Sequence, residues 1–235
     1  MNIFLRLRPV LIVLVLLLQT PATAQSPVTY SYPKNSTALL LVDPYNDFIS
    51  DGGKLWGAVK ETAEALHTVN NLVRLSNVAR EQGLKVIYVP HHQTQAHDYD
   101  GWKFKNPAHR GIERGSIFEK GSWGAEFHPG LKPLPGDLIA EEHWTSSGFA
   151  NTDLDMLLKQ HGIDHVVIAG IRANTCVEST GRYAVELGYH TTLISDAIAA
   201  FSWDEIKATA EINFPAFGHA VMTTDEFISS MKTDY

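Results

Sequence analysis

Cysteine is almost absent from this sequence: Cys176 is the only one among 235 residues. A single thiol excludes an internal disulfide, so the fold has to be stabilised by its apolar core. Runs of basic residues are also missing, and 19 lysines and arginines against 26 acidic residues give a net charge of −7. This acidic balance, without a basic patch, argues against nucleic acid as a partner.

The N-terminal segment lacks the length of a membrane-spanning helix. Its uncharged apolar run covers residues 10–18, whereas a spanning helix needs about 20 residues. Arg6 and Arg8 precede the run and the small-x-small sequence ATA follows at 22–24, as in a signal peptide. We therefore expect residues 1–24 to be removed, giving a secreted or periplasmic protein with no stable membrane association; an uncleaved anchor is the alternative. N-terminal sequencing checks this, because the mature chain should begin at Gln25.

Short apolar strands alternate with helices along residues 25–235, which we interpret as one domain. The expected strands cover residues 37–42, 84–89, 137–143, 165–171, 190–195 and 220–223. A long amphipathic helix is expected over 61–82, and a second opens at a capping-box pattern at 152–155. This alternation predicts an α/β fold with a parallel sheet covered on both faces. Residues 90–136 show little periodicity, and a loop of that length is usually functional.

Cys176 lies at a junction between two elements. The apolar run His165 to Ile171 predicts a buried strand, the polar turn 172–175 follows, and helical spacing begins near the cysteine. The free N–H groups and positive dipole of a helix N-terminus favour an anion. We therefore expect a lowered thiol pKa and a better nucleophile. The alternative is a cysteine that serves as a small buried apolar residue.

Polar residues follow three of the expected strands. Asp43, the group 141–143 and Cys176 all come at or just after a strand's carboxyl end. Ligands of open α/β sheets bind outside these ends, so the three positions are expected to meet there. This convergence favours a nucleophilic role for Cys176.

Three segments carry a family resemblance: LLLVDPYNDF, SSGFANTDLDMLL and IAGIRANTCVESTGRYAVELGY. In order and spacing they resemble the isochorismatase-like cysteine hydrolases, which include nicotinamidases, carbamoylases and isochorismatase itself. The resemblance implies a three-layer α/β/α fold with a six-stranded parallel sheet and an Asp-Lys-Cys catalytic group. It makes Asp43 the general base and Cys176 the nucleophile that forms a thioester. It also implies a cis peptide at Ile171–Arg172 and an oxyanion hole from the N–H groups of Arg172 and Cys176.

The family lysine is missing from this sequence. The corresponding stretch reads AEEHWTSSGF, and counting from either side places His143 or Glu142 at the lysine position. His143 would supply a donor or a cation beside the aspartate and the thiol. Glu142 would instead add a negative charge next to Asp43. We favour His143 and keep Glu142 as a possible third catalytic position.

Further residues are assigned to the surroundings of the site. Asn46, Trp102 and Trp144 are expected to line a substrate pocket. The histidines at positions 91, 92 and 97 invite a metal interpretation, but their spacing does not match the metal-binding pattern of nicotinamidases. We therefore expect no metal and no cofactor. The expected partners are a small-molecule substrate and further copies of the same chain, as a homo-oligomer.

The leading functional hypothesis is a cysteine-dependent hydrolase of a small amide or carbamoyl-type C–N bond, acting through a thioester. The first alternative is isochorismatase-type cleavage of a vinyl ether, which does not need the cysteine. The second is a catalytically inactive small-molecule binding protein, which the missing lysine would explain. Thiol alkylation coupled to turnover assays separates the enzymatic hypothesis from the binding protein.

Overall fold

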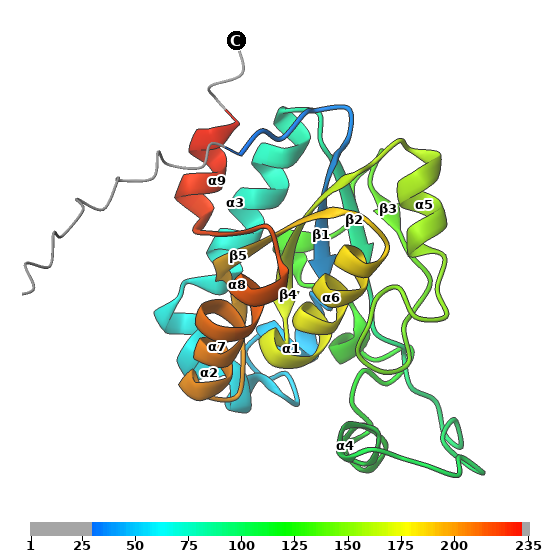
Figure 1. The fold of residues 1–235 in the computed structure, drawn as a ribbon. Coiled ribbons are helices and arrows are strands. Elements are labelled where there is room, and N and C mark those ends of the chain that lie inside the picture. The colour runs from blue at the N-terminus through cyan, green and yellow to red at the C-terminus, as the bar shows by residue number, and fades with distance from the viewer. Residues whose placement is uncertain (1–29, 232–235) are drawn as a thin grey trace, which may run out of the picture.

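A six-stranded parallel sheet in the order β3-β2-β1-β4-β5-β6 forms the centre of the structure, a computed structural model that describes residues 30–231 (Figure 1). The strands are β1 (Thr37–Val42), β2 (Lys85–Val89), β3 (Leu138–Ile139), β4 (His165–Ile171), β5 (His190–Ala199) and β6 (Ala220–Met222). All neighbouring strands pair in parallel. The predicted signal peptide, residues 1–24, lies outside the described residues.

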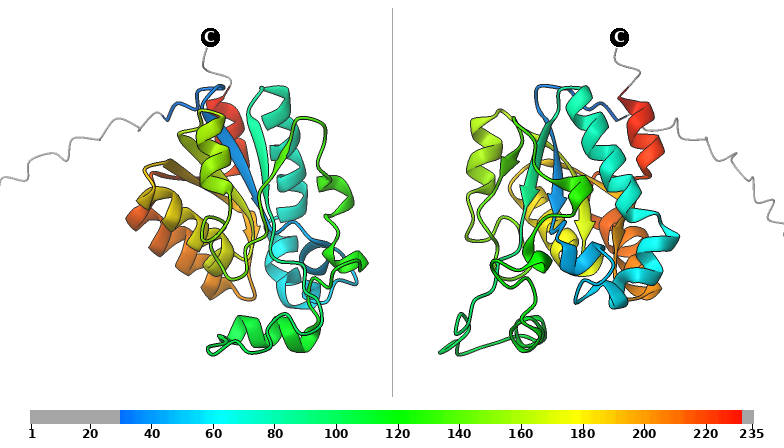
Figure 2. Two further views of the ribbon diagram at one scale, coloured as in Figure 1. Left: turned by 90° about the vertical axis from the view of Figure 1, so that its right-hand side faces the viewer. Right: turned by 180° about the vertical axis from the view of Figure 1, so that it is seen from behind.

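Helices cover both faces of the sheet, which confirms the predicted three-layer α/β/α architecture (Figure 2). One face packs against α1 (Asn46–Ile49), α2 (Trp56–Ala65), α3 (Thr68–Glu81) and α9 (Thr224–Ser230). The other face packs against α5 (Leu154–Gln160), α6 (Glu178–Glu186), α7 (Trp203–Lys207) and α8 (Phe214–Phe217). Within residues 30–231 no helix is both long and apolar enough to cross a membrane.

The two central strands, β1 and β4, are apolar after their first residue, and both of their faces are buried. Alternate side chains of β1 enter opposite cores, with Leu39 and Leu41 on one side and Leu40 and Val42 on the other. Gly170 pairs with Val42 at a φ of 132°, and a Cβ there would lie 2.1 Å from the Val42 carbonyl oxygen. Glycine therefore permits the close approach of β1 and β4 next to the site.

Several predicted element boundaries are wrong. The helix expected over 61–82 is two helices, α2 and α3, with a break where His67 adopts a left-handed conformation (φ 53°). Thr62 and Thr68, on either side of the break, donate hydrogen bonds to the carbonyl groups of Ala200 and Ile198, both at 2.7 Å. These bonds hold both helices to the end of β5.

The strand expected over 137–143 is regular only at Leu138–Ile139, although its continuation still pairs with the β2 side. The Ala140 and His143 N–H groups donate to the carbonyl groups of Tyr88 and Pro90 at 2.9 and 3.0 Å. The predicted capping box before α5 does not form either. Its Asp153 instead accepts the N–H of Glu141 at 2.7 Å, and so fixes the segment that leads to the site.

The long segment 90–136 contains a helix that the sequence interpretation did not predict, α4 (Pro107–Gly115). It also contains the short 3₁₀ turns η1 (Trp123–Ala125) and η2 (Pro129–Leu131). Figure 1 shows α4 standing out from the body, beyond the carboxyl ends of the strands. Asn106 caps this helix by accepting the N–H of His109 at 2.8 Å. The helix thus lies beyond the edge of the sheet at which ligands are expected to bind.

Candidate active site

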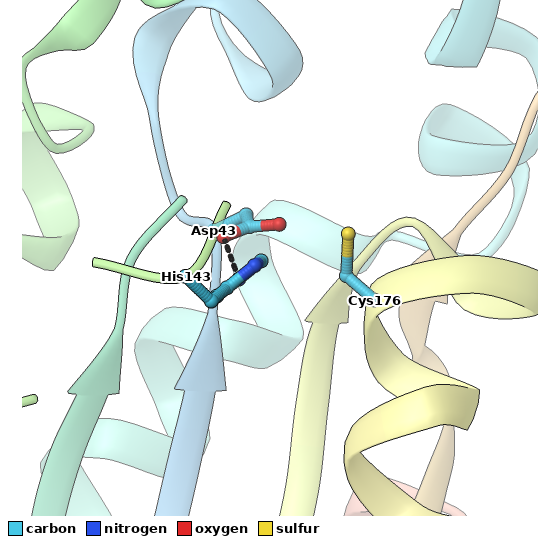
Figure 3. A group of neighbouring side chains, drawn as sticks. All are labelled: Asp43, His143 and Cys176. Atoms are coloured by element: carbon cyan, nitrogen blue, oxygen red, sulfur yellow. Dashed lines mark hydrogen bonds and ion pairs between the residues drawn. The ribbon is translucent and has the colours of Figure 1, made fainter. Parts of the chain in front are cut away.

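Asp43, His143 and Cys176 meet at the carboxyl ends of the central strands (Figure 3). Each offers one atom, and these three atoms lie within 4.8 Å of one another. Asp43 and His143 are fully buried, and Cys176 is 7% exposed. The structure therefore brings together the three residues that the sequence places at or just after strand ends.

Asp43 leaves β1 in a left-handed conformation (φ 50°), which aspartate tolerates better than most residues. Its N–H donates to the Val89 carbonyl oxygen at 3.1 Å, so the turn stays attached to β2. Its Oδ1 atom lies 3.0 Å from Nε2 of His143. Its Oδ2 atom is buried and has no hydrogen-bond partner within residues 30–231. His143 thus holds one carboxylate oxygen of Asp43, and the other is available to accept a proton.

His143, not Glu142, lies beside Asp43. Its N–H donates to Pro90 and its carbonyl accepts from His92, which locks the backbone against the end of β2. Glu142 points the other way and accepts hydrogen bonds from Nδ1 of His92 at 2.9 Å and from the Gln93 N–H at 3.0 Å. The structure therefore does not bring Glu142 to the lysine position, because adjacent residues of an extended segment face opposite sides.

The environment of Glu142 fits this outward position. Burial acts to raise its pKa, but the hydrogen bonds from His92 and Gln93 outweigh burial, and the pKa of Glu142 is lowered. Glu142 is thus an ionised partner of His92 at neutral pH and does not share a proton with Asp43.

Cys176 lies in a π-helical turn, η3 (Ala173–Val177), that leads into α6. The peptide bond between Ile171 and Arg172 is cis, at the position implied by the resemblance. The Thr175 hydroxyl donates to the sulfur of Cys176 at 3.8 Å. The strand, turn and helix thus follow one another as predicted around the thiol.

The predicted lowering of the thiol pKa is wrong. Burial, followed by the negative charge of Asp43, raises the pKa of Cys176 well above its ordinary value. The Arg172 N–H stabilises the thiolate and acts in the opposite direction, but less strongly. The helix N-terminus does not lower the thiol pKa overall, because the thiol is removed from water and faces a carboxylate. The resting enzyme therefore carries a protonated thiol.

A cavity of about 480 Å³ opens above the sulfur, between the sheet and α4. This volume suits a small organic ligand. Its apolar wall consists of Phe48, Leu55, Ile112, Ile117 and Phe201. Its polar lining includes His91, Arg114, Thr145, Ser146, Arg172 and Thr175. Cys176 lines the same cavity, so a ligand bound there reaches the thiol.

His91 adds a neutral imidazole to the cavity. Burial and the positive charge of His143 lower the pKa of His91 to about 4. Its Nδ1 atom lies 3.0 Å from the His92 carbonyl oxygen, which accepts only if Nδ1 carries the proton. The second ring nitrogen is therefore an acceptor at neutral pH. The sequence interpretation weighed His91 as a metal ligand and did not assign it to the substrate pocket.

The two arginines of the cavity differ in their partners. The guanidinium of Arg172 donates to both carboxylate oxygens of Glu205 and lies 4.0 Å from the ring centre of Phe201. Arg114 is exposed and has no ion-pair partner within the described chain. The charge of Arg114 is therefore free for a ligand. The sequence interpretation missed it, although Asn106 followed by Pro107 is a helix-start signal.

The predicted pocket residues Asn46, Trp102 and Trp144 do not line this cavity. Asn46 is buried and bonds the Trp123 carbonyl group at 2.9 Å. Trp102 and Trp144 pack together with centroids 5.7 Å apart, and both face a separate surface hollow. Trp102 also packs edge-on against His109 of α4, at 5.1 Å. Trp102 thus packs against α4, and Trp144 packs against Trp102.

The loop histidines do not share a common point. His92 contacts Glu142 through Nδ1 and Asp98 through Nε2, at 2.9 and 2.8 Å. His97 is exposed and bonds Asp100 at 2.9 Å. The only group of three metal-binding side chains within residues 30–231 is Asp43, His143 and Cys176.

The fold and the buried aspartate–histidine–cysteine group place the chain in a known class, the three-layer α/β/α hydrolases with a cysteine at a strand-to-helix turn. The Isochorismatase domain matches residues 37–226. The chain belongs to the isochorismatase family.

Particular relatives are similar over most of their length. The chain is 32% identical to a Ureidoacrylate amidohydrolase RutB of Variovorax paradoxus over 206 residues, which is 83% of this chain and 81% of the relative. A cysteine hydrolase from Pseudomonas syringae pv. phaseolicola has a similar structure, with a TM-score of 0.73, 25% identity, and coverage of 90% of this chain and 100% of that one. N-carbamoylsarcosine amidase from Thermoplasma acidophilum has a TM-score of 0.60 and 28% identity, covering 81% and 97%.

Proposed function

We propose that the protein is a cysteine-dependent amidohydrolase that cleaves a carbamoyl or ureido C–N bond of a small acid through a thioester on Cys176. The relatives named as amidohydrolases and amidases support a hydrolase of C–N bonds outside peptides. The observation that carries the proposal is the meeting of Asp43 and His143 with Cys176, which lines the cavity.

The first step is attack by sulfur. Because the thiol pKa is raised, the Sγ–H proton has to be removed as the bond to carbon forms. The partnerless Oδ2 of Asp43 takes this proton, and Sγ bonds to the substrate carbonyl carbon. The C–N bond then breaks, the nitrogen receives the proton from Asp43, and the amine or ammonia leaves. A simple amide then leaves a thioester on Cys176, and a ureido or carbamoyl substrate leaves the corresponding thiocarbamate.

His143 acts as a positioning residue. Its Nε2–H donates to Oδ1 of Asp43 at 3.0 Å and so turns Oδ2 toward the sulfur. In its protonated form the imidazole also offsets the charge of a carboxylate that is fully buried. In this way His143 supplies what the missing lysine would otherwise supply.

The developing oxyanion needs donors at the same turn. We assign this role to the backbone N–H groups of Arg172, which precedes the π-helical turn, and of Cys176, which lies within it; both residues line the cavity. The Arg172 N–H already stabilises negative charge on the sulfur. A water molecule entering through the cavity then hydrolyses the thioester, with Asp43 as the base.

The cavity favours a substrate with two polar ends. His91 offers an acceptor to an N–H of a ureido group, and Arg114 offers a free cation at the rim. The apolar wall suits a short hydrocarbon link between them. The names ureidoacrylate and N-carbamoylsarcosine both describe a ureido or carbamoyl group joined to a carboxylic acid. We therefore assign the carboxylate of the substrate to Arg114.

Replacement of Arg114 by glutamine should raise KM for ureido acids by about 10-fold, the scale of one hydrogen bond to a charged group. The KM for the matching neutral amides should stay unchanged. Ammonia release from paired acid and amide substrates measures both values. Arg110→Gln on the same helix is the matched control, since Arg110 bonds the Lys105 carbonyl group and does not line the cavity. Equal losses with both substrates would argue against a carboxylate at Arg114.

His143→Ala should lower kcat with little change in KM, and by less than the ~10²-fold that loss of a general base costs. His143→Lys should restore part of the rate, because an ammonium can donate to Oδ1 of Asp43. Glu142→Gln should leave kcat close to the wild-type value, since Glu142 faces His92. Steady-state kinetics of the three variants on one substrate check this. Loss of turnover in Glu142→Gln alone would reverse the assignment.

A further inference from the structure

The side chains of Asp43, His143 and Cys176 also form a set of metal ligands. A thiolate, an imidazole and a carboxylate are the three ligand types that zinc uses in proteins. Their candidate ligand atoms lie within 4.8 Å of one another, and all three residues are buried. A tetrahedral ion bound at ~2.0–2.3 Å would hold its ligand atoms ~3.3–3.8 Å apart. Side-chain shifts of about 1 Å would reach that geometry.

A second observation points to a cation at this place. Oδ2 of Asp43 and Nδ1 of His143 are both buried without a hydrogen-bond partner in the described part of the chain. Buried polar atoms are nearly always paired, because an unpaired one has lost its water without replacement. A bound metal ion would be coordinated by Asp43 and His143, the residues that carry these two atoms, and by the sulfur of Cys176. The cavity above Cys176 gives an ion its path and its fourth position.

The identity of residue 143 decides whether this set can bind metal. An ammonium at this position would repel a cation and offer no lone pair at neutral pH. An imidazole can give up a proton and coordinate through nitrogen. Thiolate and imidazole favour Zn²⁺, Co²⁺ and related ions over Mg²⁺ and Ca²⁺, which prefer oxygen ligands.

We propose that Asp43, His143 and Cys176 bind a thiophilic divalent cation of the Zn²⁺ type, and that this ion reversibly blocks the enzyme. On binding, the Sγ–H bond breaks, a bond from sulfur to the metal forms, and the proton leaves to solvent without any electron transfer. The sulfur is then no longer available to attack a carbonyl carbon. The block of turnover rests on the proposed function, whereas the binding of the ion does not.

Titration of the metal-free, full-length protein with Co²⁺ tests the binding directly. We expect a sulfur-to-cobalt charge-transfer absorption in the near ultraviolet together with the visible bands of a tetrahedral ion, both removed by competing Zn²⁺. Cys176→Ala should abolish the charge-transfer band. His143→Lys should weaken Co²⁺ binding by more than the ~10–100-fold that loss of an outer partner of a ligand costs.

His97→Gln is the matched control, because His97 is exposed and outside the group. It should keep the full spectrum. Absence of a thiolate band in the wild type, an unchanged affinity in His143→Lys, or loss of the spectrum in His97→Gln would overturn the proposal. Circular dichroism of each variant shows that a lost spectrum does not reflect unfolding.

Turnover separates the metal site from the proposed function. Zn²⁺ should suppress ammonia release over the same concentration range in which it displaces Co²⁺, and a chelator should restore it. Cobalt bands in a protein that hydrolyses no amide would support the metal site and count against the amidohydrolase. Zn²⁺ that binds through the thiolate without slowing turnover would overturn the block.

Discussion

Replacement of Cys176 by alanine is expected to lower kcat by more than ~10³-fold, the scale on which a covalent nucleophile is lost. The chain contains no other thiol, so no neighbouring cysteine can take over. Cys176 lines the cavity, and an alanine methyl group in place of the thiol cannot attack a carbonyl carbon. Ammonia release from the substrate that the wild type turns over fastest is the measurement.

The fold should survive this change. The side chain loses only its sulfur, and Cys176 sits in a short turn between β4 and α6 that is held by backbone bonds. Thermal unfolding should therefore shift by only a few degrees, as expected for removal of one small buried group. A folded Cys176→Ala variant that keeps a sizeable share of the wild-type rate would contradict the nucleophile assignment.

Replacement of Asp43 by asparagine is expected to lower kcat by at least ~10²-fold, because the proton acceptor for the thiol is lost. An amide can still bond His143 but cannot carry the proton from sulfur to the leaving nitrogen. The same substitution should lower the pKa of the Cys176 thiol, because the charge of Asp43 is one cause of its elevation. Alkylation by iodoacetamide as a function of pH, in the presence of a chelator, measures this pKa.

Asp43→Asn is expected to raise the alkylation rate of Cys176 and to lower kcat, two effects of opposite sign. At a given pH near neutrality the variant should be alkylated faster than the wild type while it turns over more slowly. Glu142→Gln serves as the control, because it removes a nearby carboxylate outside the group. A fall in both the alkylation rate and kcat would contradict the role of Asp43 as the charge beside the thiol.

The parts of the structure that follow from local pattern were predictable from sequence. Strands β1 and β4 match their predicted bounds because both are continuous apolar runs with polar residues directly after them. Parallel strands end at one edge of a sheet, so Asp43 and Cys176 had to approach each other once the alternation was recognised. The cis peptide at Ile171–Arg172 followed from the family resemblance alone.

The remaining features depend on contacts between distant segments. Whether His143 or Glu142 faces Asp43 is decided by the backbone hydrogen bonds between residue 143 and the end of β2. The local sequence pattern does not reveal this long-range pairing. The thiol pKa is set by burial and by Asp43, 133 positions away in the chain, and not by the local turn. The roles of Trp102 and Trp144 depend on the contact of Trp102 with His109 of α4 and on the packing of the two tryptophans together. Local pattern ranks such residues as pocket candidates because it detects aromatic side chains but not their partners.

Breakage of the C–N bond through a covalent bond to Cys176 is the step on which the proposed mechanism depends. Its most direct test is acid quenching of the enzyme during turnover of a ureido acid or amide, followed by mass spectrometry of the intact chain and of its peptides. We expect a mass increase equal to the acyl or carbamoyl part of the substrate, located on Cys176 and absent from Cys176→Ala. Full turnover without any adduct, at a rate that Cys176→Ala preserves, would contradict it.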